Sequence, residues 1–155
     1  MAKPIAVTPT YASGDLARIL EIEQRQVEDT VADLSEEQMM WRPNPKSKSA
    51  LDILWHLAYP QLHHPKPSSK AEALKGLRAA YAELQRDIAT PGKLDEPVTW
   101  WTGEVISYRG EVWGAIRHRS YHLGELVYLR QAMGVDEPRY YHEERDYSKH
   151  KGENS

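Results

Sequence analysis

The chain has 155 residues, with 20 basic and 23 acidic side chains, a formal net charge of −3 and no cysteine. This length suits one domain with a proper core. The mild charge gives no electrostatic case for binding nucleic acid, and the lack of cysteine excludes disulfides, cysteine-ligated zinc and cysteine nucleophiles. Because no apolar run reaches signal-peptide or membrane-span length, we expect a cytoplasmic protein that works without a membrane.

The first predicted helix runs from Ser13 to about Asp33. Its apolar side chains recur at helical spacing, at Leu16, Ile19, Leu20, Val27, Val31 and Leu34. A single helical turn follows, because Ser35 and Gln38 match a capping box. A proline-rich loop then leads to the second helix.

The second predicted helix begins at Ser49 and is apolar on almost every side, which predicts that it is buried. Pro60 ends or kinks it. The third helix begins at Ser69, carries its own apolar stripe, and stops at Thr90-Pro91-Gly92.

Residues 93–106 hold two short extended stretches, so we expect a small hairpin or an ordered loop there. The fourth helix spans about Ser107 to Met133, with Gly134 suited to end it. Four helices and little strand predict an all-α four-helix bundle, in one domain over residues 1–135. The long links favour a crossover connection. Residues 136–155 are predicted to be a C-terminal extension, partly disordered from Ser148 on.

Three histidines carry the strongest chemical signal. His118 and His122 are four residues apart, so they share one face of a helix. His56 lies in the apolar second helix, where a buried imidazole needs a partner. Three imidazoles on one metal ion would leave coordination positions open, which suits catalysis. The alternatives are a hydrogen-bonding role on a polar helix face for His118 and His122, and a carbonyl or carboxylate partner for His56.

Carboxylates near these histidines are candidates for a catalytic base or an orienting group, because a ligating histidine usually donates its second N–H to such a group. Asp52 lies one turn before His56, and Glu125 lies three residues after His122. Glu111 is a further candidate of this kind. Each could instead be a capping or solvated charge.

Other aromatic and histidine residues have weaker signals. Trp100 and Trp101 are candidate walls of a ligand pocket, although adjacent tryptophans more often cap a core or fill a dimer interface. His63 is disfavoured as a ligand because Pro60 separates it from the second helix. His142 and His150 belong to the tail, where we expect them to be exposed.

Three segments, in this order and spacing, resemble the DinB/YfiT-like superfamily of metalloenzymes. They are Leu34-Ser35-Glu36-Glu37-Gln38 with Trp41-Arg42-Pro43, then Ser49 to Leu57, and then His118 to Gly134. The resemblance implies a four-helix bundle with a crossover connection, often in a homodimer, and a divalent metal bound by His56, His118 and His122. The superfamily often has glutamine where Glu125 stands, so a carboxylate here lies nearer the metal than is usual.

Members of this superfamily include thiol transferases that use bacillithiol or mycothiol, and others that look like hydrolases. The resemblance therefore implies a metal-dependent thiol S-transferase or hydrolase that acts on a small molecule by activating a bound water or thiol. Zinc or nickel is expected, with iron or copper as alternatives. Because the chain has no cysteine, any thiol would be a low-molecular-weight co-substrate. The alternatives are a non-catalytic stress-response or interaction protein with a structural metal, and a metal-free bundle with a polar core.

Overall fold

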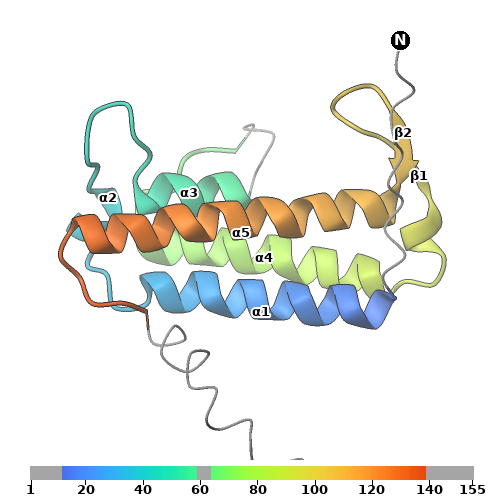
Figure 1. Cartoon of the computed structure of the whole chain (residues 1–155), viewed down its shortest axis with the longest axis horizontal. Coiled ribbons are helices and arrows are strands. Elements are labelled where there is room, and N and C mark those ends of the chain that lie inside the picture. Colours follow the sequence, from blue (N-terminus) through green and yellow to red (C-terminus); the bar gives the residue numbers. More distant parts are fainter. Residues whose placement is uncertain (1–11, 59–63, 139–155) are drawn as a thin grey trace, which may run out of the picture.

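Helices packed side by side make up most of the structure, a computed structural model that describes residues 12–58 and 64–138 (Figure 1). The elements in chain order are α1 (Ser13–Val31), α2 (Glu36–Met40), α3 (Ala50–Ala58), α4 (Lys70–Ala89), the 3-10 turn η1 (Lys93–Asp95), β1 (Pro97–Thr99), β2 (Val105–Ser107) and α5 (Tyr108–Ala132). The predicted four-helix bundle is confirmed, and the ambiguous segment forms an antiparallel hairpin of β1 and β2. His63, His142, His150 and the extension after Pro138 lie outside the described residues.

The ends of the helices follow from capping residues. Ser35 Oγ accepts a hydrogen bond from Gln38 N (3.1 Å) and Gln38 Oε1 accepts one from Ser35 N (2.8 Å), which is the predicted capping box of α2. At the end of α5, Gly134 adopts a positive φ of 72°. Val135 N then donates to Arg130 O (3.0 Å), which closes the last turn.

The order of the helices in space differs from their order in the chain. α1 packs against α4 and α5, and α3 packs against the same two helices, so α1 and α3 lie on a diagonal of the bundle. Figure 1 shows α3 and α4 running in one direction and α1 and α5 in the other. Because α3 and α4 are parallel, joining them requires a crossover connection, as expected.

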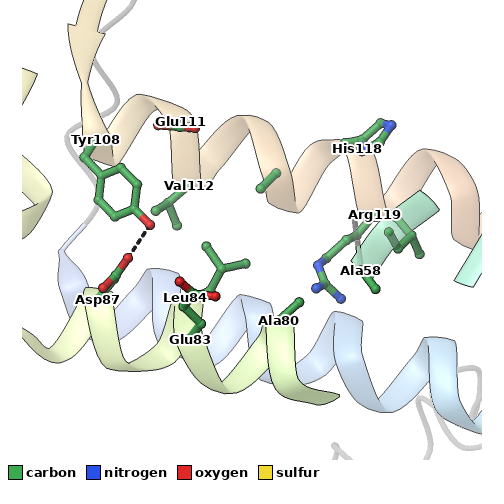
Figure 2. Close-up of a pocket in the computed structure, with 12 residues that line it drawn as sticks. Ala58, Ala80, Glu83, Leu84, Asp87, Tyr108, Glu111, Val112, His118 and Arg119 are labelled. Carbon is green, nitrogen blue, oxygen red and sulfur yellow. Dashed lines mark hydrogen bonds between the residues drawn. The ribbon is translucent and has the colours of Figure 1, made fainter. Parts of the chain in front are cut away.

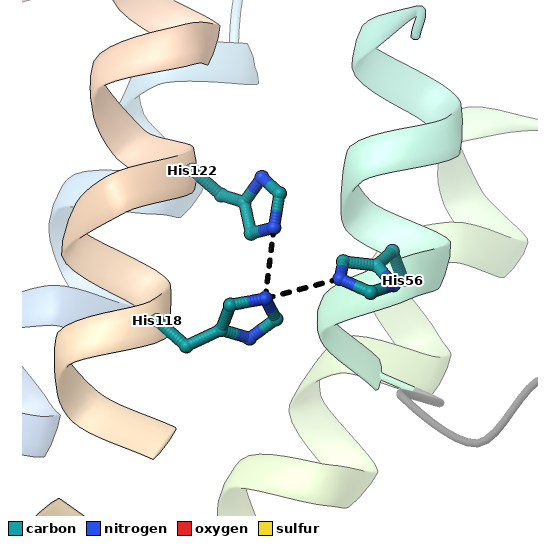
Figure 3. A group of neighbouring side chains, drawn as sticks. All are labelled: His56, His118 and His122. Carbon is teal, nitrogen blue, oxygen red and sulfur yellow. Dashed lines mark hydrogen bonds between the residues drawn. The ribbon is translucent and has the colours of Figure 1, made fainter. Parts of the chain in front are cut away.

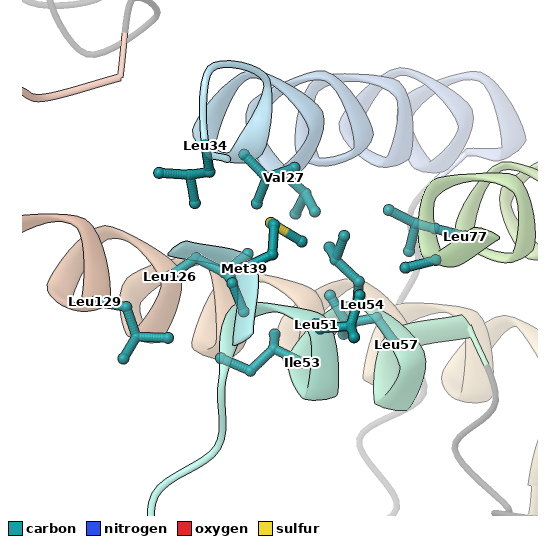
Figure 4. Close-up of a cluster of buried hydrophobic side chains, with 13 residues drawn as sticks. Val27, Leu34, Met39, Leu51, Ile53, Leu54, Leu57, Leu77, Leu126 and Leu129 are labelled. Atoms are coloured by element: carbon teal, nitrogen blue, oxygen red, sulfur yellow. The ribbon is translucent and has the colours of Figure 1, made fainter. Parts of the chain in front are cut away.

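Two apolar clusters form the core. The first joins α2 and α3 to the neighbouring halves of α1, α4 and α5 (Figure 4), and its members include Val27, Met39, Leu51, Leu54, Leu77 and Leu126. The second lies near the hairpin end and contains Leu16, Leu20, Ile88, Leu94, Val112 and Ile116. Along α1 and α5, the buried side chains of Gln24, Arg119 and His122 fall between the two clusters. A polar layer therefore crosses the bundle near its middle.

The short length of α3 shapes the site. α3 has 9 residues, whereas α4 has 20 and α5 has 25. At about 1.5 Å per residue, α3 covers less than half the length of its neighbours. Beyond Ala58, a cavity of about 220 Å³ opens with walls from α4 and α5. Among the helices that the structure describes, none is long and apolar enough to cross a membrane.

Candidate metal centre

Three imidazole rings meet where the last turn of α3 faces the middle of α5 (Figure 3). The Nε2 atom of His118 lies 3.1 Å from Nε2 of His56 and 3.0 Å from Nε2 of His122. One nitrogen from each ring lies within 4.8 Å of the other two. His122 is almost fully buried, and His56 and His118 are half-buried.

Glu125 decides which nitrogen of His122 carries the proton. Its Oε2 atom lies 2.6 Å from His122 Nδ1, and a carboxylate there accepts a hydrogen bond from Nδ1–H, which leaves the lone pair on Nε2. His118 Nε2 carries at most one proton and faces two other ring nitrogens, so proton sharing cannot satisfy both contacts. A cation between the three nitrogens removes that conflict.

The imidazoles are held in the form that binds metals. Burial, followed by the positive charges of His122, Lys48 and His118, lowers the pKa of His56 to about 4. Burial, followed by the charge of His122, also lowers the pKa of His118. Because metal ions bind the deprotonated nitrogen, both rings are ready to act as ligands at neutral pH.

The donor set fits a transition metal such as zinc. With Zn–N bonds of about 2.0–2.1 Å, neighbouring nitrogens lie about 3.3 Å apart in a tetrahedral site and about 2.9 Å apart at right angles. The two Nε2 separations that involve His118, 3.0 and 3.1 Å, fall within this range, and the nitrogens of all three rings lie within 4.8 Å of one another. The C-terminal end of α3, where His56 lies, also favours a positive charge.

The cavity beyond α3 begins at this centre, because His118 is part of its lining (Figure 2). At its other end, the Tyr108 hydroxyl donates to Asp87 Oδ2 (2.6 Å). Burial, then the hydrogen bond and charge of Asp87, then Glu111 and Glu83 raise the pKa of Tyr108 above its usual range. Arg119 lines the cavity next to His118, and burial lowers its pKa to about 10.

Asp52 is placed differently from Glu125. Its Oδ2 accepts from Ser49 N (2.8 Å) and pairs with Arg42 Nη2 (2.6 Å), and its Oδ1 pairs with Lys66. Burial raises the pKa of Asp52, but the hydrogen bonds from Lys66 and Ser49 outweigh it and hold the pKa below its usual value. The capping alternative accounts for the contact with Ser49, and a role of Asp52 as base or orienting group stays a prediction.

The two tryptophans also lie away from the cavity beside His118. Trp100 packs on α5, where a Cβ added to Gly114 would come within 2.7 Å of the indole ring. Trp101 is 85% exposed. Neither residue contributes to the lining of that cavity. The core-capping alternative suits Trp100.

Two residues of the site were not singled out in the sequence. Arg119 and Gln24 are buried and joined by a hydrogen bond from Nη1 to Oε1 (2.9 Å). A signal existed for Arg119, since the stripe through Val112, Ile116 and Leu126 passes through position 119 at helical spacing. An arginine inside an apolar stripe points to a buried polar contact.

Comparison with known proteins supports the fold. No protein-family model matches the chain, and no curated protein sequence matches it. The structure is similar to the crystal structure of a protein from Exiguobacterium sibiricum 255-15 assigned to the DinB family. The TM-score is 0.67 at 17% identity, over 82% of this chain and 95% of that chain. The chain therefore has a DinB-like helical fold, and within it His56, His118 and His122 come together.

Proposed function

We propose that this protein binds a divalent metal ion through His56, His118 and His122 and uses it in catalysis. The convergence of the three ring nitrogens is the observation that carries the proposal. Glu125 supports it, because its contact with His122 Nδ1 directs the Nε2 lone pair toward the other two rings. Zinc or nickel suits three imidazoles best, with iron or copper as alternatives.

The proposed reaction is thiol transfer or hydrolysis on a small molecule. A divalent ion with three neutral ligands lowers the pKa of a bound water or thiol toward neutrality and so supplies a nucleophile. The chain's own residues position the reactants: Glu125 orients His122, and the cavity next to His118 offers room for a substrate. Because the chain contains no cysteine, a thiol nucleophile would come from a low-molecular-weight co-substrate.

Metal analysis tests the proposal directly. We expect purified wild-type protein to carry close to one equivalent of a divalent transition metal, and His118→Ala and His122→Ala to lose most of it. His64→Ala is the matched control, because His64 is an exposed histidine of the described chain outside the trio. Equal metal content in all four proteins would contradict the proposal.

A cobalt-substituted protein separates a catalytic from a structural ion. Adding 2-mercaptoethanol should change the visible spectrum of the cobalt centre, since a free coordination position accepts the thiol. A visible spectrum that stays unchanged when either 2-mercaptoethanol or azide is added would favour a structural ion instead.

The second candidate function is a non-catalytic interaction protein. The exposed side chains of Trp101 (85%) and Val105 (69%) on the hairpin favour it, because apolar side chains of this size often mark contact surfaces.

A homodimer is proposed in either case, supported by Tyr121 and Tyr128, which are 65% and 60% exposed on α5. Light scattering should then report twice the 17.8 kDa of one chain, and Tyr121→Ser/Tyr128→Ser should report one chain.

A further inference from the structure

The cavity between α4 and α5 has the dimensions and lining of a binding site for a compact molecule. Its volume of about 220 Å³ is below the roughly 300–1,000 Å³ of most ligand pockets. Leu57, Leu84, Val112 and Ala115 provide apolar wall, and the charged residues lie toward its two ends. Figure 2 shows His118 and Arg119 at one end and Tyr108 with Asp87 at the other.

Arg119 is a buried charge whose only hydrogen-bond partner in the described chain is neutral. Its side chain is 3% exposed, and Nη1 donates to Gln24 Oε1 at 2.9 Å. Gln24 in turn donates from Nε2 to Glu28 Oε1 (2.7 Å), which fixes the amide orientation. Arg119 forms no ion pair with any residue that the structure describes, although the charge of Glu23 acts on it and opposes the effect of burial on its pKa. A guanidinium has five N–H donors, so most of them lack a protein partner.

The guanidinium reaches into the space between the helices. Figure 2 shows its side chain extending from α5 into the bundle, and it lines the cavity together with Ala80 of α4. Burying an unpaired charge is costly unless an opposite charge and hydrogen bonds compensate for it. An anionic group of a ligand in the cavity would supply both.

Away from Arg119, the charged residues that line the cavity include three acidic side chains. Glu83, Asp87 and Glu111 all contribute to the lining. Asp87 is engaged by the Tyr108 hydroxyl. Glu83 and Glu111 form no ion pair in the part of the chain that is described, so their carboxylates are available to a ligand. A simple anion would be repelled by these carboxylates, and a simple cation would leave the Arg119 guanidinium without an ion-pair partner.

We propose that this cavity binds a small amphoteric substrate, with a carboxylate or similar anionic group on Arg119 and an ammonium group on Glu83 and Glu111. The middle of such a molecule lies along the apolar wall, and its anionic end lies on the same side of the cavity as His118. The proposal rests on the proposed function in one respect only, since it takes the cavity as the substrate site of the histidine centre.

The test uses ε-aminocaproate, which carries both charges on a flexible chain, against caproate and hexylamine, which carry one each. Binding is followed by amide chemical shifts of isotope-labelled, zinc-loaded protein. We expect ε-aminocaproate to give saturable shifts at residues that line the cavity and to bind more tightly than either single-charge analogue. Equal affinity for all three, or no saturable shift with ε-aminocaproate, would overturn the proposal.

Charge variants identify the residues that make the contacts. Arg119→Gln should weaken ε-aminocaproate about 10–100-fold, the usual effect of losing hydrogen bonds to a charged group. Glu83→Gln/Glu111→Gln should weaken it about 2–5-fold, because those carboxylates are more exposed. Arg117→Gln is the matched control on the other side of His118, and it should leave the affinity unchanged. Arg119→Gln with wild-type affinity would exclude Arg119 as the anion site.

Arg119→Lys covers the case in which Arg119→Gln does not fold. Lysine keeps the charge but lacks the planar fork of donors, so we expect affinity to fall several-fold, and unchanged affinity would count against the proposal. His122→Ala separates this inference from the metal, because His122 does not line the cavity. If zinc-loaded wild-type protein shows no saturable shift with ε-aminocaproate, the inference is overturned and the proposed function is not. Equal metal content with cavity binding in both proteins overturns the proposed function alone.

Discussion

Glu125 illustrates how one residue can set the chemistry of another. It lies three positions after His122 on α5, so its carboxylate reaches Nδ1 of the imidazole ring. That contact leaves Nε2 with its lone pair, and Nε2 is the nitrogen that faces His118. The carboxylate is partly exposed while His122 is 2% exposed, so the ring is fixed from the outside of the bundle.

Replacing Glu125 tests this role. Glu125→Leu should weaken zinc binding about 10–100-fold, the range observed when the partner of a ligating histidine is lost. Glu125→Gln should weaken it less, because an amide oxygen still accepts a hydrogen bond from Nδ1–H. Competition with a chromophoric chelator measures both affinities. Wild-type affinity in the leucine variant would show that His122 needs no orienting group.

Arg130 joins the end of α5 to the end of α1. Its buried guanidinium donates from Nη1 to Thr30 O (2.8 Å) and from Nε to Asp136 O (2.9 Å), and it pairs with the Asp33 carboxylate. The hydrogen bond from Arg130 holds the pKa of Asp33 below its ordinary value of 3.8, against the opposing effect of burial.

The lowered pKa of Asp33 predicts a pH dependence. A carboxyl whose folded pKa is lowered stabilises the fold above its unfolded pKa and loses that effect as the pH falls through the folded value. Asp33→Asn should therefore be less stable than wild type by about 0.2–1 kcal/mol at pH 6, since Asp33 is largely exposed. Urea unfolding should show this difference shrinking toward pH 3. A constant difference would contradict it.

The histidine geometry was only partly accessible from the sequence. The spacing of His118 and His122 puts both rings on one helix face without further information. That His56 meets them depends on which helices are neighbours, and only the family resemblance suggested it. A role for Asp52 as base or orienting group stays a prediction, and the position one turn before His56 is also the start of α3, where its carboxylate accepts a hydrogen bond from Ser49 N.

At the scale of elements, helix boundaries were predictable and helix partners were not. Ser35, Ser69, Ser107 and Gly134 mark the ends of helices through local hydrogen bonds that the sequence itself specifies. The parallel direction of α3 and α4 depends on the connection between them, which leaves no periodic signal. The packing of Trp100 on Gly114 likewise depends on how the hairpin lies against α5.

The contact between the hairpin and α5 makes a testable pair of glycine substitutions. Gly124→Ala should raise the free energy of unfolding by about 0.5–1 kcal/mol, because nothing lies within 4 Å of the added Cβ and alanine favours a helix. Gly114→Ala should lower it by about 1–3 kcal/mol, because the Cβ would come within 2.7 Å of Trp100. Denaturant unfolding measures both. Equal effects would mean that Trp100 moves away freely.

At the scale of the molecule, the proposed metal links α3 to α5 across the polar layer. Zinc at a hundred times its dissociation constant should stabilise the folded state by about 2.7 kcal/mol, which raises the thermal midpoint by about 5–10 °C for a chain of this size. The shift should disappear in His122→Ala and with excess chelator. A midpoint that rises equally in wild type and His122→Ala would point to zinc binding elsewhere.

The end of α3 at Ala58 separates two properties that many enzymes must change together. The positions of the three imidazoles depend on α5 and on the last turn of α3. The size of the cavity depends on how many turns α3 has. Extending α3 would make the cavity smaller while leaving the ring nitrogens in place. Replacing its lining residues with smaller ones would make it larger. Substrate size can thus drift in evolution, or be altered by design, without any change in the chemistry that the histidines support.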